Sequence, residues 1–341
     1  MRGEPRTPSE PVAPPDVTVI IVSYNTRELT LACLRSLFAE TRDVRFECRV
    51  VDNASTDGSA AAIAEQFPQV RLDARKDNLG FAAANNRAAR DAHSPYLLLL
   101  NPDTVVLDGA VDRLVAFARQ HPDRRIYGGR TLFADGALNP TSCWRRSTLW
   151  SEFCHAVGLT ACFRGSAWLN PEAYGGWPRD SVREVDLVSG CFFLIERELW
   201  EQLGGFDPAF FMYGEEADLC LRARRLGARP TVCPHATIVH YGGKSERQRA
   251  GKLVRMLRAR RMLMQRHWPR WQRATGRFVQ RLGVRIRRWG FAIAARLGRA
   301  AARESAATYE EVWRRRSEWD IRDEAAGEAA AQAREARHVG A

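Results

Sequence analysis

Residues 94–109 read SPYLLLLNPDTVVLDG, and this stretch decides the fold class of the chain. Four consecutive leucines predict a short strand that is buried on both faces, as at the centre of a parallel sheet. Because Pro102 has no N–H to donate, we expect the strand to end at about Asn101 and Asp103. In open α/β sheets, ligands bind at the carboxyl ends of the strands. The stretch therefore predicts a ligand site that contains a carboxylate.

Two earlier stretches extend the predicted sheet. Residues 17–24 (VTVIIVSY) and 48–51 (CRVV) have the pattern of short apolar strands, and helical patterns follow them at residues 26–38 and 59–67. Strands that alternate with helices over short connections predict βαβ units. The expected fold class is α/β, with a Rossmann-like, mostly parallel central sheet flanked by helices.

Polar side chains follow both of these strands. Ser23, Tyr24 and Asn25 stand at the end of the first strand, and Asp52 follows the second, at the same predicted sheet edge as the end of the leucine strand. Asp52 is placed to hold a ribose or a base through its polar edge. The alternative is that Asp52 and Asp57 only cap the turn and the helix that follows it.

A further polar stretch, residues 76–90, reads KDNLGFAAANNRAAR. Asn78 and Gly80 predict a tight turn before a helix of small residues, which can lie close to a neighbour. Asn85 and Asn86 would face opposite sides of that helix. Each of these patterns is weak alone, but their fixed order over about 85 residues is specific.

In this order the patterns resemble the family 2 inverting glycosyltransferases of the GT-A fold, and most of all the rhamnosyltransferase-like bacterial members that build surface polysaccharides. The matching motifs are V-S-Y-N at residues 22–25, V-D-N-x-S-x-D-G-S at 51–59, N-x-G-F-A-x-x-x-N at 78–86 and L-N-P-D at 100–103. The resemblance implies a nucleoside-diphosphate sugar as donor, linked to dTDP or UDP.

The resemblance also implies roles for single residues. Asp52 would contact the nucleobase, and Asp103 would be the ligand of Mg²⁺ or Mn²⁺ in a DxD-type motif. Asn101 stands where many relatives have the first Asp, so one carboxylate of that motif is absent. The donor-binding set that the motifs imply is Ser23, Tyr24, Asn25, Asp52, Asn78, Gly80, Asn85 and Asn101, together with Lys244 further along the chain.

The second half of the chain supports the likeness. Residues 184–203 predict a strand, a Ser-Gly break and a helix, and residues 214–227 (GEEADLCLRARRLG) predict another helix. Glu215 and Glu216, at the start of that helix, could be first-turn acids that interact favourably with the helix dipole. The family has an E-D pair here, and its second acid is the catalytic base. The resemblance therefore implies Glu216 as the base, with Glu in place of Asp.

Residues 237–245 (TIVHYGGKS) place a histidine after a short predicted strand. A lone histidine is more often structural, but relatives carry a similar H-x-G-G-x-S. The resemblance therefore implies that His240 lies near the diphosphate or the metal. Lys244 and Ser245 would be secondary contacts to phosphate.

The basic residues of the chain are concentrated near its C-terminus. Residues 247–303 hold 18 Lys and Arg and no Asp or Glu, and subtracting 18 from the formal net charge of +12 leaves −6 for the remainder. After Pro269, apolar residues recur every three or four positions, and Arg281, Arg285 and Arg288 flank them. The recurring residues are Phe278, Leu282, Ile286, Trp289, Ile293 and Leu297. This basic amphipathic pattern predicts contact with an anionic membrane surface through residues 277–299.

The first 15 residues are polar and rich in proline, which indicates a disordered leader rather than a signal peptide or anchor. No apolar run reaches the roughly 18–20 residues that span a bilayer. The eight cysteines form no C-x-x-C pair and no zinc spacing, so we expect reduced core thiols. The expected location is cytoplasmic, at the inner face of the plasma membrane.

Residues 131–180 are the expected acceptor side, where the aromatic faces of four tryptophans would suit sugar stacking. In such a segment tryptophans are at least as often core residues. The four are Trp144, Trp150, Trp168 and Trp177.

The expected organisation has four parts. They are the leader (residues 1–15), the catalytic domain (16–245, with a nucleotide half 16–130 and an acceptor half 131–245), a basic amphipathic helical segment (246–303) and a polar helical or disordered tail (304–341). For the helix near residues 253–268, packing on the catalytic domain is the alternative to contact with the membrane.

The resemblance implies inverting transfer of a sugar, with rhamnose favoured, to a polysaccharide or polyprenyl-linked glycan. The chemistry needs charge stabilisation of the leaving diphosphate and a carboxylate base for the acceptor hydroxyl. A nucleotidyltransferase would also use metal-bound Asp beside a nucleotide, and a nucleic-acid-binding protein would explain the Arg/Trp segment. Neither alternative accounts for all the strand-end and helix-start acids together.

Overall fold

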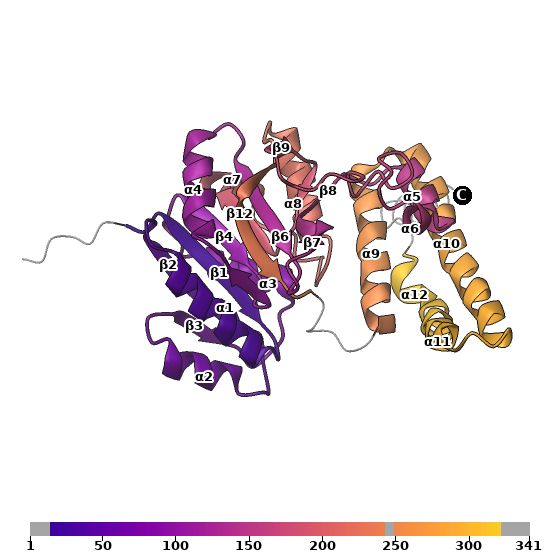
Figure 1. Cartoon of the computed structure of the whole chain (residues 1–341), viewed down its shortest axis with the longest axis horizontal. Coiled ribbons are helices and arrows are strands. Elements are labelled where there is room, and N and C mark those ends of the chain that lie inside the picture. Colours follow the sequence, from indigo (N-terminus) through magenta and orange to yellow (C-terminus); the bar gives the residue numbers. More distant parts are fainter. Residues whose placement is uncertain (1–13, 243–248, 322–341) are drawn as a thin grey trace, which may run out of the picture.

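The computed structural model describes residues 14–242 and 249–321. Within them, a ten-stranded sheet has the strand order β3-β2-β1-β4-β11-β6-β12-β5, with β7 beside β6 and β9 beside β12 (Figure 1). The strands are β1 (Val17–Ser23), β2 (Phe46–Asp52), β3 (Arg71–Ala74), β4 (Tyr96–Leu100), β5 (Thr104–Val106), β6 (Ile126–Leu132), β7 (Leu138–Asn139), β8 (Cys143–Trp144), β9 (Arg183–Glu184), β10 (Leu187–Val188), β11 (Phe192–Glu196) and β12 (Thr231–His240). β8 and β10 form a separate antiparallel pair.

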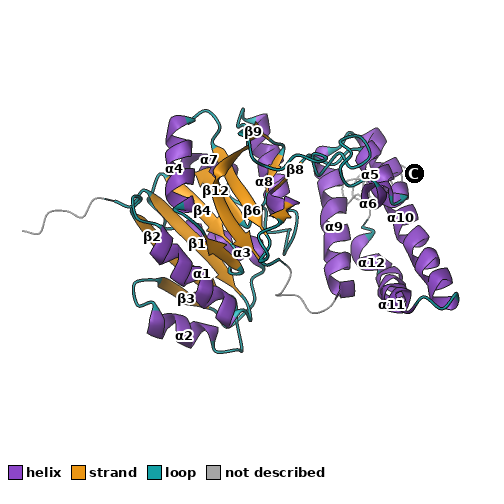
Figure 2. Cartoon of the chain, viewed as in Figure 1, coloured by secondary structure: helices purple, strands orange, loops and turns teal. Residues whose placement is uncertain are grey.

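The helices alternate with the strands in the first half of the chain, as predicted, and follow them at the C-terminus (Figure 2). They are α1 (Arg27–Glu40), α2 (Ser59–Gln66), α3 (Phe81–Ala89), α4 (Ala110–Gln120), α5 (Leu149–Ala156), α6 (Leu159–Cys162), α7 (Arg197–Leu203), α8 (Glu215–Arg225), α9 (Arg249–His267), α10 (Arg270–Arg296), α11 (Ala300–Arg314) and α12 (Arg316–Trp319). The prediction of an α/β fold with a mostly parallel central sheet is confirmed.

The leucine strand, β4, is buried along its whole length. It pairs parallel with β1, as expected, but antiparallel with β11 on its other side. The reason is the entry point of β11. Its first residue, Phe192, pairs with Leu100 at the end of β4, so the chain can only run back along β4 in the opposite direction.

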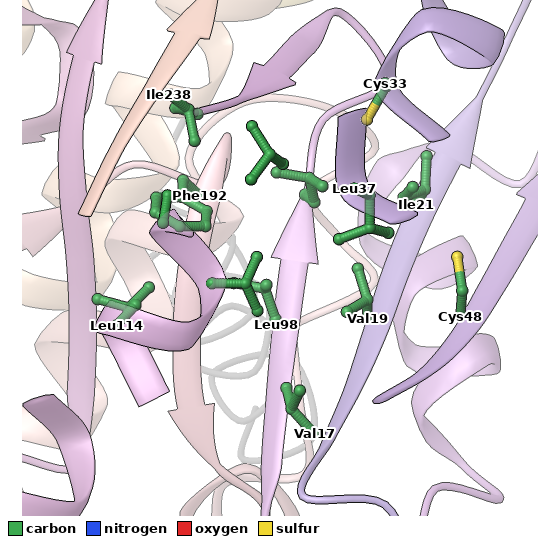
Figure 3. Packing of buried hydrophobic residues seen from close by; sticks show 14 of the residues in the cluster. Val17, Val19, Ile21, Cys33, Leu37, Cys48, Leu98, Leu114, Phe192 and Ile238 are labelled. Carbon is green, nitrogen blue, oxygen red and sulfur yellow. The ribbon is translucent and has the colours of Figure 1, made fainter. Parts of the chain in front are cut away.

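Two layers of helices explain why neighbouring strand residues are all buried. Alternate residues of a strand point to opposite faces of the sheet. Val19 and Leu98 pack on one face against α1, α2 and α4, whereas Ile20 and Leu99 pack on the other against α3, α7 and α8. Figure 3 shows the first of these clusters, with Leu37 of α1 and Leu114 of α4 against the sheet.

The four C-terminal helices pack on one another and on segments of the catalytic domain. α9 contacts the start of α8, where an added Cβ at Gly214 would lie 3.1 Å from Ala259 Cβ. α10 contacts α5 so closely that an added Cβ at Gly283 would lie 2.9 Å from the Cα of Ala156. For the helix near residues 253–268, these contacts fit the alternative in which it packs on the catalytic domain.

Two composition-based predictions can be compared with the structure. All eight cysteines are free, and all except Cys162 are buried, as expected. None of the helices in the described part of the chain has the length and hydropathy needed to span a membrane. The predicted leader lies almost wholly outside the described residues.

Candidate active site

The β1 end is held by short hydrogen bonds to α1 and to the β2–α2 turn. The buried Ser23 hydroxyl lies 3.0 Å from the Thr30 hydroxyl on α1. Asn25 has a φ of +51° and accepts a hydrogen bond from the Thr56 backbone N–H at 2.8 Å. Tyr24 between them is exposed. Ser23 and Asn25 therefore shape this edge, and Tyr24 is the side chain of the three that reaches solvent.

The two aspartates after β2 differ in what they bind. Asp57 accepts hydrogen bonds from the Arg27 and Ser59 N–H groups at 2.9 and 3.0 Å, so it fixes the turn before α2. Asp52 is buried, and its Oδ1 accepts the Ser55 N–H at 3.0 Å. Its Oδ2 is buried without a hydrogen-bond partner among the described residues. Capping accounts for Asp57 fully but for only one oxygen of Asp52.

The Asn78–Gly80 turn is tied to the end of β2. The buried Asn53 donates to Asn78 Oδ1 at 2.8 Å and accepts the Leu79 N–H at 2.8 Å. Gly80 has a φ of +79°, and an added Cβ would lie 2.5 Å from the backbone oxygen of Phe211. Glycine is therefore required by both the backbone conformation and the close approach of the Phe211 loop.

Asn85 and Asn86 lie on different sides of α3, as predicted. The buried Asn85 donates to the Phe81 oxygen at 2.8 Å within its own helix. Asn86 bonds twice to the backbone of Phe206, donating at 2.7 Å and accepting at 2.9 Å. Asn86 therefore joins the nucleotide half to the acceptor half, a role that the sequence motif did not indicate.

Asp103 and His240 lie together after β4 and at the end of β12. His240 Nε2 is 3.3 Å from the Asp103 carboxylate and 3.4 Å from the Asn101 side-chain nitrogen. Asp103 is buried, and His240 Nδ1 is buried with no hydrogen-bond partner in the part of the chain that the structure describes. The structure thus brings together three of the predicted site residues.

Two opposing effects act on His240. Burial alone would lower the pKa of its imidazole, but the neighbouring Cys191 thiol and Asp103 carboxylate raise that pKa to about 10. Without another cation, the imidazole is therefore charged at neutral pH and pairs with Asp103. The pair marks the place at this sheet edge where positive charge is stabilised.

The segment between β10 and β11 links this pair to α8. The Asn101 N–H donates to the Cys191 oxygen at 3.1 Å. One residue earlier, an added Cβ at Gly190 would lie 3.5 Å from the Phe81 ring and 4.0 Å from Glu216 Cβ. The Ser-Gly break that interrupts the predicted strand therefore lies between the strand-end pair and the base candidate.

Glu215 and Glu216 occupy the first turn of α8, after Gly214 with a φ of +90°. Burial raises the pKa of both carboxyl groups, and the charge of Glu216 raises that of Glu215 further. A hydrogen bond from Glu215 opposes the rise at Glu216. Glu215 is therefore the member that keeps a proton, and Glu216 is the member that ionises first.

Tyr213 shows that the two parts of the site are neighbours. Burial raises the pKa of its phenol, Arg255 of α9 lowers it, and Glu215, Glu216 and Asp103 raise it. These acids therefore lie within electrostatic reach of one hydroxyl. Tyr213 has a φ of +72°, an uncommon conformation for a residue with a side chain. The sequence offered no signal for Tyr213 beyond its position before the Glu-Glu pair.

The four tryptophans of the expected acceptor side divide into two pairs. Trp144 and Trp177 are partly buried against the second core cluster. Trp150 and Trp168 are exposed, with ring centroids 4.9 Å apart. The core interpretation fits the first pair and leaves the second free to contact a ligand. Lys244 and Ser245 lie outside the described residues.

The donor set at Asp103 and His240 fits a hard divalent cation. No cluster of three or more His, Cys, Asp or Glu arranged for a metal is found among residues 14–242 and 249–321. Mg²⁺ and Mn²⁺ sites often have one or two protein ligands and complete their coordination with substrate phosphates and water. Asp103 supplies a buried carboxylate for that arrangement, and His240 would supply a nitrogen once the cation has displaced the imidazole proton.

The family follows from comparison with known proteins. Residues 18–204, which contain β1, β2, β4 and most of the motifs described above, match the pattern of glycosyl transferase family 2. The chain therefore belongs to glycosyl transferase family 2, and it is a glycosyltransferase.

Curated relatives include rhamnosyltransferases. The chain is 30% identical over 251 residues to the N-acetylglucosaminyl-diphospho-decaprenol L-rhamnosyltransferase of Mycobacterium tuberculosis, covering 70% of this chain and 80% of that protein. It is 28% identical over 255 residues to the rhamnosyltransferase WbbL of Escherichia coli K12, covering 70% and 88%. The O-antigen biosynthesis protein RfbC of Myxococcus xanthus is 30% identical over 243 residues, which are 68% of this chain but 18% of that protein.

Solved structures show the same fold at low identity. The mannosyltransferase PcManGT from Pyrobaculum calidifontis, in complex with GDP-Man and Mn²⁺, superimposes with a TM-score of 0.53 and 19% identity, covering 93% of this chain and 92% of that chain. GalNAc-T7 with UDP, GalNAc and Mn²⁺ gives a TM-score of 0.54 and 15% identity over 76% of this chain and 49% of that chain. The predicted GT-A fold is confirmed.

Proposed function

We propose that the protein transfers a sugar with inversion from a nucleoside-diphosphate donor to a glycan or polyprenyl-linked acceptor. The observation that carries the proposal is the Glu215–Glu216 pair, with Glu215 buried and Glu216 partly buried, beside the Asp103–His240 pair. Inversion requires a base on the face of the sugar opposite the leaving group, as in hydrolysis of glycosidic bonds with inversion. The leaving diphosphate also requires positive charge. The Glu215–Glu216 pair would supply the base, and the Asp103–His240 pair would supply the site for that charge.

At the donor end, three residues are proposed to bind the nucleotide and its diphosphate. The unpartnered Oδ2 of Asp52 would accept a hydrogen bond from the base. Asp103 and His240 would hold Mg²⁺ or Mn²⁺ against the diphosphate oxygens. The cation, when bound, supplies positive charge that stabilises the leaving nucleoside diphosphate. The remaining motif residues, among them Tyr24, Asn78, Gly80 and Asn101, would shape the pocket around the donor.

At the acceptor end, Glu216 is proposed as the base. The acceptor hydroxyl gives its proton to Glu216 while its oxygen forms a bond to the anomeric carbon, and the bonding electrons of the departing C–O bond leave with the nucleoside diphosphate. Glu215 keeps its proton and donates a hydrogen bond to Glu216, which favours the ionised form of the base. General base catalysis of this kind contributes roughly 10²–10⁴-fold to the rate.

The names of two relatives support a choice of donor sugar and of acceptor. Both are named as rhamnosyltransferases, and one of these acts on N-acetylglucosaminyl-diphospho-decaprenol. We therefore propose an L-rhamnosyl donor, with dTDP favoured over UDP, and a polyprenyl-diphosphate-linked acceptor. Such an acceptor is held in a bilayer, which favours action at the inner face of the plasma membrane. Trp150 and Trp168 are the exposed side chains proposed to stack on acceptor sugars.

A donor screen tests the proposal. The protein is incubated with dTDP-rhamnose, UDP-sugars and GDP-mannose in the presence of Mn²⁺ and a polyprenyl-diphosphate acceptor, and released nucleotide is identified. Release of dTDP or UDP coupled to glycan formation supports the transferase. Release of the sugar 1-phosphate, which is the leaving group when the nucleotidyl group of these donors is transferred, would instead support the nucleotidyltransferase alternative.

A further inference from the structure

The longest helix, α10, exposes a continuous apolar face that no part of the described chain covers. Its side chains recur every three or four residues and therefore share one side of the helix. Those with more than a third of their surface exposed range from Ile286 at 41% to Leu297 at 76%. The set, called here the α10 outer face, consists of the exposed residues Trp271, Phe278, Ile286, Trp289, Ile293 and Leu297 and the partly buried Leu282 among them.

The opposite side of α10 accounts for its packing, so the outer face is not needed for the fold. The buried residues Gly276, Gly283 and Val284 face α9, α5 and the small core around Val312. Gln280 donates to the Leu257 oxygen of α9 at 3.0 Å. Trp271 and Leu297 are 26 positions apart, so the outer face runs for about 39 Å along the helix.

A row of arginines borders the outer face. Arg270, Arg281, Arg285, Arg296 and Arg299 are all exposed. Arg285 lies 5.6 Å from the ring centroid of Trp289, so cation and aromatic face are presented together. The acids of this region lie on α11, on α12 or directly after it, and they are already paired, for example Glu310 with Arg288 and Asp320 with both Arg277 and Arg281.

The charge of the region identifies its partner. Residues 249–321 contain 20 Lys and Arg and five Asp and Glu, a net charge of +15. A second copy docked on the outer face would bring two arginine rows together, which like-charge repulsion opposes. Nucleic acid would satisfy the arginines but leave the aliphatic side chains Ile286, Ile293 and Leu297 in water.

We propose that the α10 outer face lies in the interface of an anionic bilayer. There the apolar side chains enter the acyl boundary, the two tryptophans sit at headgroup depth, and the arginines contact anionic headgroups. Of the three partners considered, the bilayer is the one that accommodates both the apolar side chains and the arginines that border them. The surface lies outside the catalytic site, and only its purpose, to hold the enzyme beside a lipid-linked acceptor, rests on the proposed function.

Vesicle binding tests the proposal with the full chain. We expect binding to phosphatidylcholine vesicles that contain phosphatidylglycerol, weakened at least about tenfold without phosphatidylglycerol or in high salt. The triple variant Phe278→Ser, Trp289→Ser, Ile293→Ser should bind at least about tenfold more weakly. A matched control removes three exposed apolar side chains elsewhere, Phe133→Ser, Phe153→Ser, Phe163→Ser, and should bind like wild type.

Three results would overturn the proposal. The first is that wild type and the α10 variant bind vesicles equally. The second is that the control variant loses as much binding as the α10 variant. The third is that wild type does not bind vesicles but self-associates or retains RNA, and that the α10 variant loses this property. Circular dichroism verifies that each variant is folded. Nucleotide release with a water-soluble acceptor is measured in parallel. Vesicle binding without transfer would contradict the proposed activity alone, and transfer without vesicle binding would contradict the membrane surface alone.

Discussion

The Asp103–His240 pair and the Glu215–Glu216 pair lie in one candidate site but differ in how their buried charge is compensated. At the strand end, a carboxylate faces an imidazole whose pKa is raised to about 10, so opposite charges meet. At the start of α8, two carboxyl groups face each other and burial raises the pKa of both. The first arrangement suits cation binding, whereas the second suits proton transfer. The role of an acidic residue therefore depends on the charges around it as well as on its residue type.

The largest expected effect is on turnover. Glu216→Gln removes the proton acceptor but keeps the shape of the side chain, so kcat should fall by roughly 10²–10⁴-fold while donor affinity stays within about twofold. Glu198→Gln is the matched control, because Glu198 is an exposed first-turn acid of α7. Steady-state rates and calorimetric donor binding provide the two readouts. Turnover near that of wild type in Glu216→Gln would remove this residue from the role of base.

The second expected effect is on donor binding. Asp103→Asn keeps the size of the side chain but removes its charge, so donor affinity in Mn²⁺ should fall about tenfold to a hundredfold, equivalent to about 1.4–2.8 kcal/mol. Asp108→Asn, at an exposed position in the following turn, is the control. Affinity is measured with Mn²⁺ and with a chelator. If wild type binds the donor equally in both conditions, Asp103 does not act through a metal.

Much of the nucleotide half could be predicted because its signals are local. The apolar runs of β1 and β4 and the periodicity of α1 and α8 depend on neighbouring residues, and the structure confirms each of them. Motif order then placed Asp52 and Asp103 at one sheet edge. The capping contacts of Asp52 and Asp57 could also be anticipated from turn chemistry.

The remaining features depend on residues far apart in the chain. Cys191 and Tyr213 contact the site only because β11 runs antiparallel to β4 and the Phe211 loop closes on Gly80. β5 was not predicted, since its three residues gain their partner from β12 more than 130 positions later. Periodicity carries no information about such pairings.

A smaller effect distinguishes the two members of the Glu pair. Because burial raises the pKa of Glu216, kcat/KM should rise with pH through a pKa above the ordinary value of 4.5. This rise is the acid limb of the pH profile. Glu215→Gln keeps an N–H donor and should leave the pH of the acid limb nearly unchanged. Glu215→Ala removes the hydrogen bond that lowers the pKa of Glu216, so the limb should move to higher pH by about half a unit to one unit.

The pH profile has a result that would reverse the assignment. A limb that moves to lower pH in Glu215→Ala would mean that a negative charge at Glu215 had been opposing ionisation of Glu216. In that case Glu215 would be the member that ionises first, and the two roles would be exchanged.

The smallest expected effect tests how α8 is held. His267 of α9 lies 2.8 Å from Asp218, two residues after Glu216, and Arg222 donates to the same carboxylate at 2.7 Å. His267→Ala should lower the free energy of unfolding by about 1–2 kcal/mol and reduce kcat a few-fold, because Arg222 still pairs with Asp218. His235→Ala, at an exposed position, is the control. Identical thermal unfolding of the two variants would show that this bond does not hold α8.

The most direct test of the central claim follows the anomeric centre of the transferred sugar. The reaction with the accepted donor is monitored by proton NMR, which identifies both the released nucleotide and the configuration of the new glycosidic bond. Release of nucleoside diphosphate with inverted configuration, abolished in Glu216→Gln, is the predicted result. Retention of configuration, or inversion that persists in Glu216→Gln, would contradict a single-displacement transfer with Glu216 as the base.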